Sequence, residues 1–180
     1  GQFIGKIFPH TQGSRKLVRS SASSSRLDSI DRRILARLQR DTTLPMAELA
    51  EQVGLSLTPC WRRVQKLEKD GYILKRIAVL DRHLLNASVT VFVAIRTTEH
   101  SIEWIDRFYK ATRDMDEVVD IYRMSGEIDY LIRAFVPNIE AYDKLYKKLI
   151  SKLPASNVTS MFAMEEIKST SEVPLSFLDD

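Results

Sequence analysis

The stretch from Pro45 to Gly71 decides the fold, and it reads PMAELAEQVGLSLTPCWRRVQKLEKDG. Its first part predicts a short helix, because Pro45 suits a first helical turn and apolar side chains follow at helical spacing. Gly54 supplies the left-handed conformation that ends a helix, and Leu55 fills the corner after it. The apolar stripe of this helix comprises Leu49, Ala50 and Val53.

A second helix is predicted after Gly54, with Ser56 or Thr58 as its cap and Pro59 in its first turn. Its core side comprises Cys60, Val64 and Leu67. The opposite, cationic side is then free to enter the DNA major groove, as the second helix of a helix-turn-helix does. The candidate DNA-binding residues are Thr58, Pro59, Arg62, Arg63 and Lys66.

Within this cationic side, Arg62 or Arg63 is the candidate for reading bases, because both lie near the start of the helix. Lys66 is the candidate for a phosphate contact. A solvated charged face is the ordinary alternative, but the position on the second helix of this motif favours DNA contact. For Thr58, capping of the helix is favoured over contact with a thymine methyl group or a phosphate.

A further helix precedes this pair, because residues 28–41 place apolar side chains on one face. Asp28 is a good cap, and Asp31 lies in the first turn, where its charge favours the positive end of the helix dipole. The apolar face comprises Ile30, Ile34, Leu35 and Leu38. We therefore predict a three-helix DNA-binding domain over residues 27–72.

Charge is distributed unevenly along the chain. Residues 1–80 hold 15 Lys and Arg against 7 Asp and Glu, whereas residues 81–180 hold 12 against 17. A polyanion-binding half thus precedes an acidic half. Residues 1–26 lack helical periodicity and are rich in Ser, so we predict a disordered tail or, given the leading Gly, the remnant of an expression tag. A cationic arm that touches phosphates is the alternative for this tail.

Composition limits the remaining possibilities. With 180 residues, 44% of them hydrophobic, the chain can form one domain or two small ones. No apolar run approaches the roughly 20 residues that span a bilayer, so we expect a soluble protein with no membrane partner. The single cysteine and the absence of a secretory signal pattern favour the cytoplasm.

The second half predicts an α+β fold. Short strands at Tyr72–Leu74 and Ile77–Leu80 indicate a wing, followed by a hinge, over residues 73–87. Residues 88–180 then read strand, helix, strand, strand, helix, strand, which is the order of a ferredoxin-like βαββαβ unit. The predicted elements are Val89–Ile95, Ile102–Ala111, Val118–Met124, Tyr130–Val136, Asn138–Leu153 and Val158–Ile167.

The first of these strands predicts a partner. Val89–Ile95 is apolar on both faces apart from Thr90, although a sheet with one wet face should alternate. The chain has no spare helix to cover the second face. A second copy of the sheet is the simplest cover, so we expect a symmetric homodimer that presents two helix-turn-helix units to double-stranded DNA.

Together these features resemble the Lrp/AsnC (feast/famine) family of transcriptional regulators over residues 27–178. In the first half the match is carried by Leu27-Asp28, Asp31, Ile34-Leu35, Leu49-Ala50, Val53-Gly54-Leu55-Ser56, Thr58-Pro59-Cys60, Arg63-Val64, Leu67-Glu68 and Gly71. In the second half it is carried by Gly126, Asp129-Tyr130-Leu131 and Pro174-Leu175. The spacing is collinear across both halves.

The resemblance implies a DNA-binding domain, a hinge strand and an effector domain that forms dimers and often octamers. It implies a small amino acid effector near the Gly-x-x-Asp loop, at Ser125, Gly126, Asp129 and Tyr130. Asp129 can pair with an α-ammonium group and Gly126 allows close backbone approach, although both residue types also simply make turns.

Within the family, three segments look like the branch that controls cysteine detoxification, which favours cysteine as the effector. These segments are Thr58-Pro59-Cys60-Trp61, His100-Ser101-x-Glu103-Trp104 and Phe162-Ala163-Met164-Glu165.

The alternative is a metabolic enzyme or a ligand-binding module without DNA. His10, His83 and His100 lack metal-ligand spacing, and we recognise no nucleophile motif or phosphate loop, so we expect no cofactor and no catalysis. Cys60 is favoured as a buried apolar residue over a thiol switch, and Trp61 as an anchor of its helix against the neighbouring helices.

Overall fold

The computed structural model describes residues 27–99, 101–153 and 157–178. They form two compact units: residues 27–79 together with 168–178, and residues within 80–167. The predicted tail over 1–26 lies outside the described residues. The sequence prediction placed residues 168–178 in the second domain, but they belong to the first unit, because polar contacts join them to its first helix.

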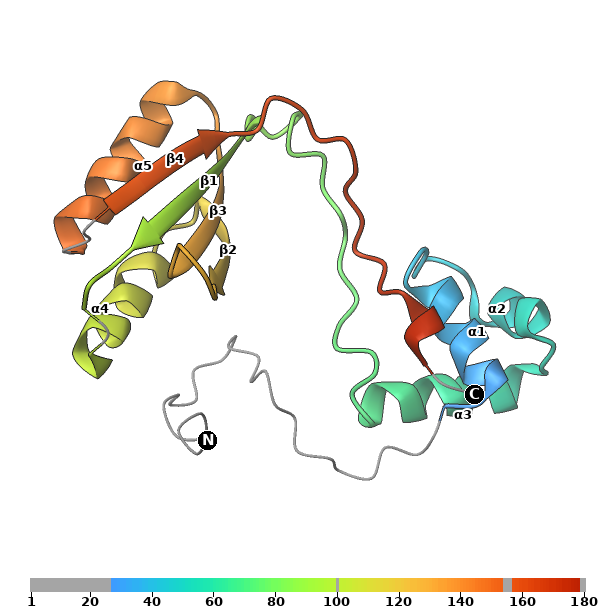
Figure 1. Cartoon of the computed structure of the whole chain (residues 1–180). Coiled ribbons are helices and arrows are strands. Elements are labelled where there is room, and N and C mark those ends of the chain that lie inside the picture. Colours follow the sequence, from blue (N-terminus) through green and yellow to red (C-terminus); the bar gives the residue numbers. More distant parts are fainter. Residues whose placement is uncertain (1–26, 100, 154–156, 179–180) are drawn as a thin grey trace. The chain divides into compact units, whose positions relative to one another are not determined.

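Three helices make the first unit (Figure 1): α1 (Ser29–Leu38), α2 (Met46–Val53) and α3 (Leu57–Lys69). Asp28 caps α1 as predicted, because its Oδ1 accepts hydrogen bonds from the backbone N–H groups of Ile30 and Asp31, at 2.9 and 2.8 Å. Asp31 in turn accepts from the Asp28 backbone N–H, which completes a capping box. Gly54 ends α2 with a φ of 74°, the left-handed conformation that the sequence predicted.

The core of this unit contains eight of the ten predicted apolar residues, while the other two, Ile30 and Leu35, are half-buried against it. It comprises Ile34, Leu38, Leu49, Ala50, Val53, Cys60, Val64 and Leu67. Burial raises the pKa of the Cys60 thiol, as expected for a residue that packs as a small apolar group. The predicted anchoring role of Trp61 is wrong, because this side chain lies 51% exposed on the outer side of α3.

The predicted wing strands are absent, since none of residues 72–88 belongs to a strand. Side chains that would have to pack in a wing, such as Leu74 and Ile77, are more than half exposed. A two-stranded hairpin without a buried face is marginal in water, so a short apolar run alone does not make one.

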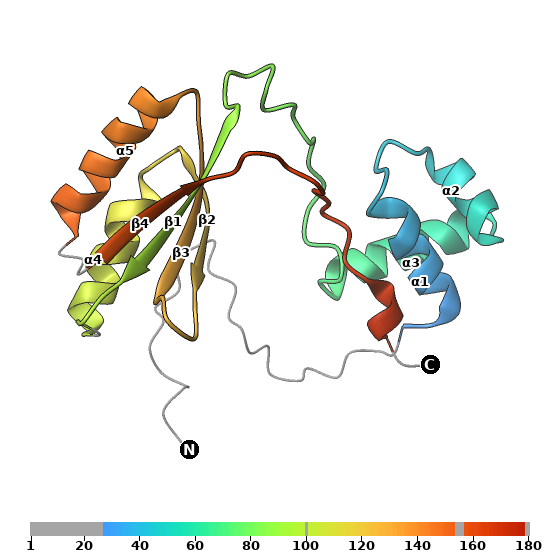
Figure 2. The same ribbon diagram turned by 45° about the horizontal axis from the view of Figure 1, so that its top comes forward.

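The second unit is a four-stranded antiparallel sheet in the order β2-β3-β1-β4, with two helices on one face (Figures 1 and 2). It confirms the predicted βαββαβ order. Its elements are β1 (Val89–Arg96), α4 (Ile102–Arg113), β2 (Val118–Arg123), β3 (Tyr130–Val136), α5 (Ile139–Lys152) and β4 (Asn157–Phe162). A 3₁₀ turn, η1 (Leu175–Phe177), follows in the C-terminal segment.

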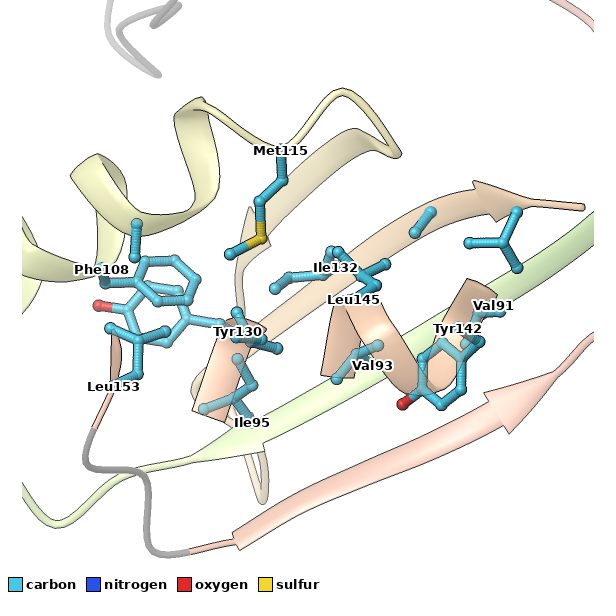
Figure 3. Close-up of a cluster of buried hydrophobic side chains, with 14 of the residues drawn as sticks. Val91, Val93, Ile95, Phe108, Met115, Tyr130, Ile132, Tyr142, Leu145 and Leu153 are labelled. Carbon is cyan, nitrogen blue, oxygen red and sulfur yellow. The ribbon is translucent and has the colours of Figure 1, made fainter. Parts of the chain in front are cut away.

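The core of this unit lies between the sheet and the two helices (Figure 3). β3 alternates strictly between buried and half-buried side chains, as a strand with one covered face should. β1 lies at the centre of the sheet and buries Val91, Val93 and Ile95 toward the helices. β4 ends at Phe162 rather than near Ile167, because its pairing with β1 ends there.

Candidate functional site

The outer side of α3 is the candidate DNA-binding surface. Pro59 occupies the first turn, where its missing N–H costs no helical hydrogen bond. Thr58, Arg62 and Lys66 follow one another at intervals of four residues, and all three side chains are exposed. Trp61 adds a half-exposed aromatic ring to this side of the helix. The structure therefore brings together four of the five predicted DNA-binding residues: Thr58, Pro59, Arg62 and Lys66.

Arg63 is the exception, and the prediction that it faces outward is wrong. Its Nη1 lies 2.6 Å from Asp28 Oδ2 and 2.8 Å from Asp31 Oδ1, so that its guanidinium joins α3 to the capping box of α1. Two-thirds of its side chain is buried. The pairing of Arg63 leaves Arg62 as the candidate for reading bases.

In this Arg63 cluster, the guanidinium and the Asp28 carboxylate each favour the charged form of the other. The pKa of Asp28 is lowered, first by the hydrogen bond from the Asp31 backbone N–H and further by the Arg63 guanidinium. The pKa of Arg63 is raised by its hydrogen bonds to Asp31 and Asp28. The Arg63 guanidinium is thus held by two carboxylates and is not free to contact a nucleic acid.

The carboxylate of α3 next to the candidate DNA-binding surface is also paired. Glu68 accepts hydrogen bonds from Arg76 Nη2, at 2.9 Å, and from Gln65 Nε2, at 3.2 Å. Arg76 therefore offsets the negative charge that Glu68 would otherwise hold near a phosphate backbone.

The loop between β2 and β3 is the candidate effector site. Its neck is closed by two backbone hydrogen bonds, from Met124 N–H to Asp129 C=O and from Asp129 N–H to Ile95 C=O, at 2.8 and 2.9 Å. The Asp129 carboxylate is held at Oδ2 by the Thr97 backbone N–H, at 2.8 Å. Ser125 is exposed at the tip. Three predicted effector residues, Ser125, Gly126 and Asp129, thus lie on one loop.

Gly126 has a φ of 119°, a conformation that side chains rarely adopt. A Cβ added there would meet nothing within 4 Å. The glycine is therefore required by the backbone of the turn, and the described residues include no close neighbour that explains it.

The side chain of Tyr130 does not join this group, and its predicted place beside an effector stays a prediction. The side chain is buried on the helix-covered face, with its ring centroid 4.4 Å from that of Phe108 (Figure 3). Its ring centroid lies 5.3 Å from that of Trp104. Burial raises the pKa of its hydroxyl. The alternation of side chains along β3 explains the difference, since residue 130 begins the buried series.

A hollow on the open face of the sheet adds a residue that the sequence analysis missed. Arg96, at the end of β1, lies in this hollow, and its Nε donates to the Glu127 C=O at 2.7 Å. The position of Arg96, a charged residue at the end of an apolar strand, is the feature of the sequence that could have indicated it. The hollow is lined by Ala94, Arg96, Glu127, Ile128, Asn157, Thr159 and Met161.

Other kinds of site find no support in the described part of the chain. No group of three or more His, Cys, Asp and Glu side chains could hold a metal ion there. None of the described helices is long and apolar enough to cross a membrane.

Comparison with known proteins also finds two domains in the chain. Residues 27–73 match a winged helix-turn-helix DNA-binding domain, and residues 90–173 match the Lrp/AsnC ligand-binding domain. The chain belongs to the Lrp/AsnC family of transcriptional regulators. This regulator therefore combines a DNA-binding domain with a ligand-binding domain, as the sequence analysis predicted.

Two curated relatives of this Lrp/AsnC regulator are similar along most of their length. The DNA-binding transcriptional activator DecR of Escherichia coli is 47% identical over 150 residues, which cover 83% of this chain and 99% of DecR. The glutamate uptake regulatory protein of Zymomonas mobilis is 45% identical over 150 residues, which cover 83% of this chain and 92% of that protein.

Solved structures show the same fold. An AsnC-family regulator from Agrobacterium tumefaciens matches with a TM-score of 0.82 and 55% identity, over 84% of this chain and 99% of its own. A transcriptional regulator from Neisseria meningitidis, solved in complex with L-Met, matches with a TM-score of 0.79 and 31% identity, over 83% of this chain and 97% of its own.

Proposed function

We propose that this Lrp/AsnC regulator binds double-stranded DNA through the outer side of α3 and changes its DNA affinity when a small amino acid binds beside the β2–β3 loop. The observation that carries the first part is the row of Thr58, Arg62 and Lys66 on the second helix of a helix-turn-helix. All three side chains are exposed, and neither cation of the row has an ion-pair partner within the described residues. Residues near the start of such a helix reach base edges. We assign base contact to Arg62 and phosphate contact to Lys66.

The effector proposal rests on two charged groups near the loop. Asp129 Oδ2 is fixed by the Thr97 N–H, which leaves Oδ1 to accept from an α-ammonium group. Arg96 lies in the adjacent hollow and can pair with an α-carboxylate through the guanidinium nitrogens that do not bind Glu127. The L-Met complex of the Neisseria relative supports an amino acid as ligand. Cysteine is the amino acid that we favour, on the family branch that the sequence resembles.

A homodimer is the assembly that we propose, and it forms through the open face of the sheet. This face presents Phe92 and Leu131 from neighbouring strands, and Tyr122 and Met161 on either side of them are about half exposed. An apolar surface of this kind on a sheet is typical of a protein interface. Further assembly, to an octamer, would bring the loops of several dimers together.

Two measurements test the function. Binding of the purified protein to DNA from upstream of its own gene should be tight at low salt and weaken steeply as salt rises. A protein that binds no DNA at low salt would instead be an enzyme or a ligand-binding module. A thermal-shift screen against the twenty amino acids should reveal at least one that raises the unfolding temperature, because a ligand of the native state stabilises it.

A further inference from the structure

The C-terminal segment, residues 172–178, lies against the end of α1 in the DNA-binding unit (Figures 1 and 2). Glu172 Oε2 accepts from Arg40 Nε at 3.0 Å. The next residue, Val173, donates its backbone N–H to Gln39 Oε1 at 2.9 Å. Gln39 is the C-cap residue of α1, so two consecutive residues of the segment hold two consecutive residues at the end of this helix.

The turn that follows is oriented by these contacts. Pro174 precedes η1, and the Leu178 N–H donates to the Leu175 C=O at 3.3 Å. Leu175 and Leu178 are half-buried, whereas Phe177 between them is 81% exposed. Residues three apart lie on one side of a 3₁₀ turn, so the segment has an inner apolar side and an outer side.

The C-terminal segment also connects the ligand-binding domain to the DNA-binding unit. Two chain segments join the units: one leaves the DNA-binding unit after α3, and residues 163–171 return to it from β4. β4 is an edge strand, and Asn157, Thr159 and Met161 line the hollow beside Arg96. Any ligand that fills this hollow contacts the strand that continues into the C-terminal segment.

We infer that the end of α1, formed by Gln39 and Arg40, is a docking surface for residues 172–178 of this chain, and that this docking carries the state of the ligand-binding domain to the DNA-binding unit. The inference deepens the proposed function and rests on it for the second half. A bound segment restrains the DNA-binding unit at a second point, so a ligand that shifts β4 changes the free energy of the DNA-competent arrangement.

Hydrogen exchange tests the docking without DNA. Arg40→Ala and Glu172→Ala should each speed amide exchange within residues 172–178 by about two- to fivefold, since the pair is a surface ion pair. Amide exchange in the double variant should be about as fast as in either single variant, because both changes remove the same interaction. Arg37→Ala and Glu165→Ala are matched controls, because each removes the same kind of charge from an exposed side chain that takes no part in the Arg40–Glu172 pair. Unchanged exchange in both test variants would overturn the docking.

A deletion of residues 172–180 tests the coupling. The shortened protein should still bind both the upstream DNA and the amino acid that stabilises the intact protein. The change in DNA affinity that this amino acid causes should fall at least threefold. An unchanged response would overturn the coupling. Failure of the intact protein to bind DNA would instead refute the proposed function, while the exchange measurement would still decide the docking.

Discussion

Two neighbouring arginines of α3 lie in different surroundings, because one of them is paired. Arg62 is exposed, whereas the Arg63 guanidinium is held between Asp28 and Asp31. Sequence periodicity distinguished the buried Cys60, Val64 and Leu67 correctly, since apolar burial follows helical spacing. It could not find the partners of Arg63, because Asp28 and Asp31 lie more than 30 residues earlier and meet it only through tertiary packing.

Replacing each arginine by alanine distinguishes a DNA contact from a structural ion pair. Arg62→Ala should weaken binding to the upstream DNA about tenfold or more and leave thermal stability unchanged, because only a DNA contact is lost. Arg63→Ala should lower the free energy of unfolding of the DNA-binding unit by about 1 kcal/mol, since it leaves two carboxylates without their partner in a half-exposed site. Titration and thermal unfolding measure the two effects. Equal losses of stability would contradict the assignment.

The Arg63 cluster also predicts a dependence on pH. Because the pKa of Asp28 is lower in the folded unit than its usual value of 3.8, its charge stabilises the fold above that value. This stabilisation should be lost as the pH falls below about 4 and through the lowered pKa of the folded state. The unfolding temperature of the wild type should therefore fall more steeply below pH 4 than that of Asp28→Asn. If the unfolding temperatures of the two proteins fall in parallel below pH 4, the stabilising role of the Asp28 charge is contradicted.

At the scale of elements, the β2–β3 loop shows how a turn can place functional groups. The sequence predicted the hairpin and its Gly and Asp, because these residue types dominate turns. It also grouped Tyr130 with them, but the side chain of Tyr130 lies apart from theirs for a geometric reason. The first residue of β3 already follows the alternation of the strand, so its side chain points to the core while Asp129 remains at the edge.

Gly126→Ala should weaken amino acid binding and leave the fold intact. No neighbour would clash with the new methyl group, so the cost is the strain of a φ of 119°, of the order of 1–2 kcal/mol. The loop can relieve this strain by moving its backbone, which shifts Asp129. Met124→Ala is the matched control, because it changes an exposed side chain at the neck of the same loop without the strain. Calorimetric titration with the stabilising amino acid compares the two, and equal affinities would contradict a role for the conformation.

At the scale of the whole molecule, the open sheet face accounts for the apolar character of β1 on both sides. The sequence predicted a partner from this pattern alone. It could not predict the return of residues 168–178 to the DNA-binding unit, because one ion pair and one hydrogen bond from a backbone N–H produce no periodic pattern in the sequence.

Met161→Asp should dissociate the proposed dimer, because it places a charge within the apolar open face. Sedimentation should show a shift from dimer or larger assemblies toward the monomer. Met164→Asp is a matched control, since Met164 is 97% exposed and lies beyond the end of β4. An unchanged mass for Met161→Asp would place the interface elsewhere.

Because Cys60 is buried, the reactivity of its thiol reports on the opening of the DNA-binding unit. This is the sole thiol of the chain, and it lies with no exposed surface in the core of the DNA-binding unit. Alkylation of Cys60 therefore requires that unit to open, whatever happens in the ligand-binding domain. The rate of Cys60 alkylation should fall when DNA binds and rise in Arg63→Ala. Mass spectrometry of this one residue therefore measures how often the DNA-binding unit opens in the intact protein.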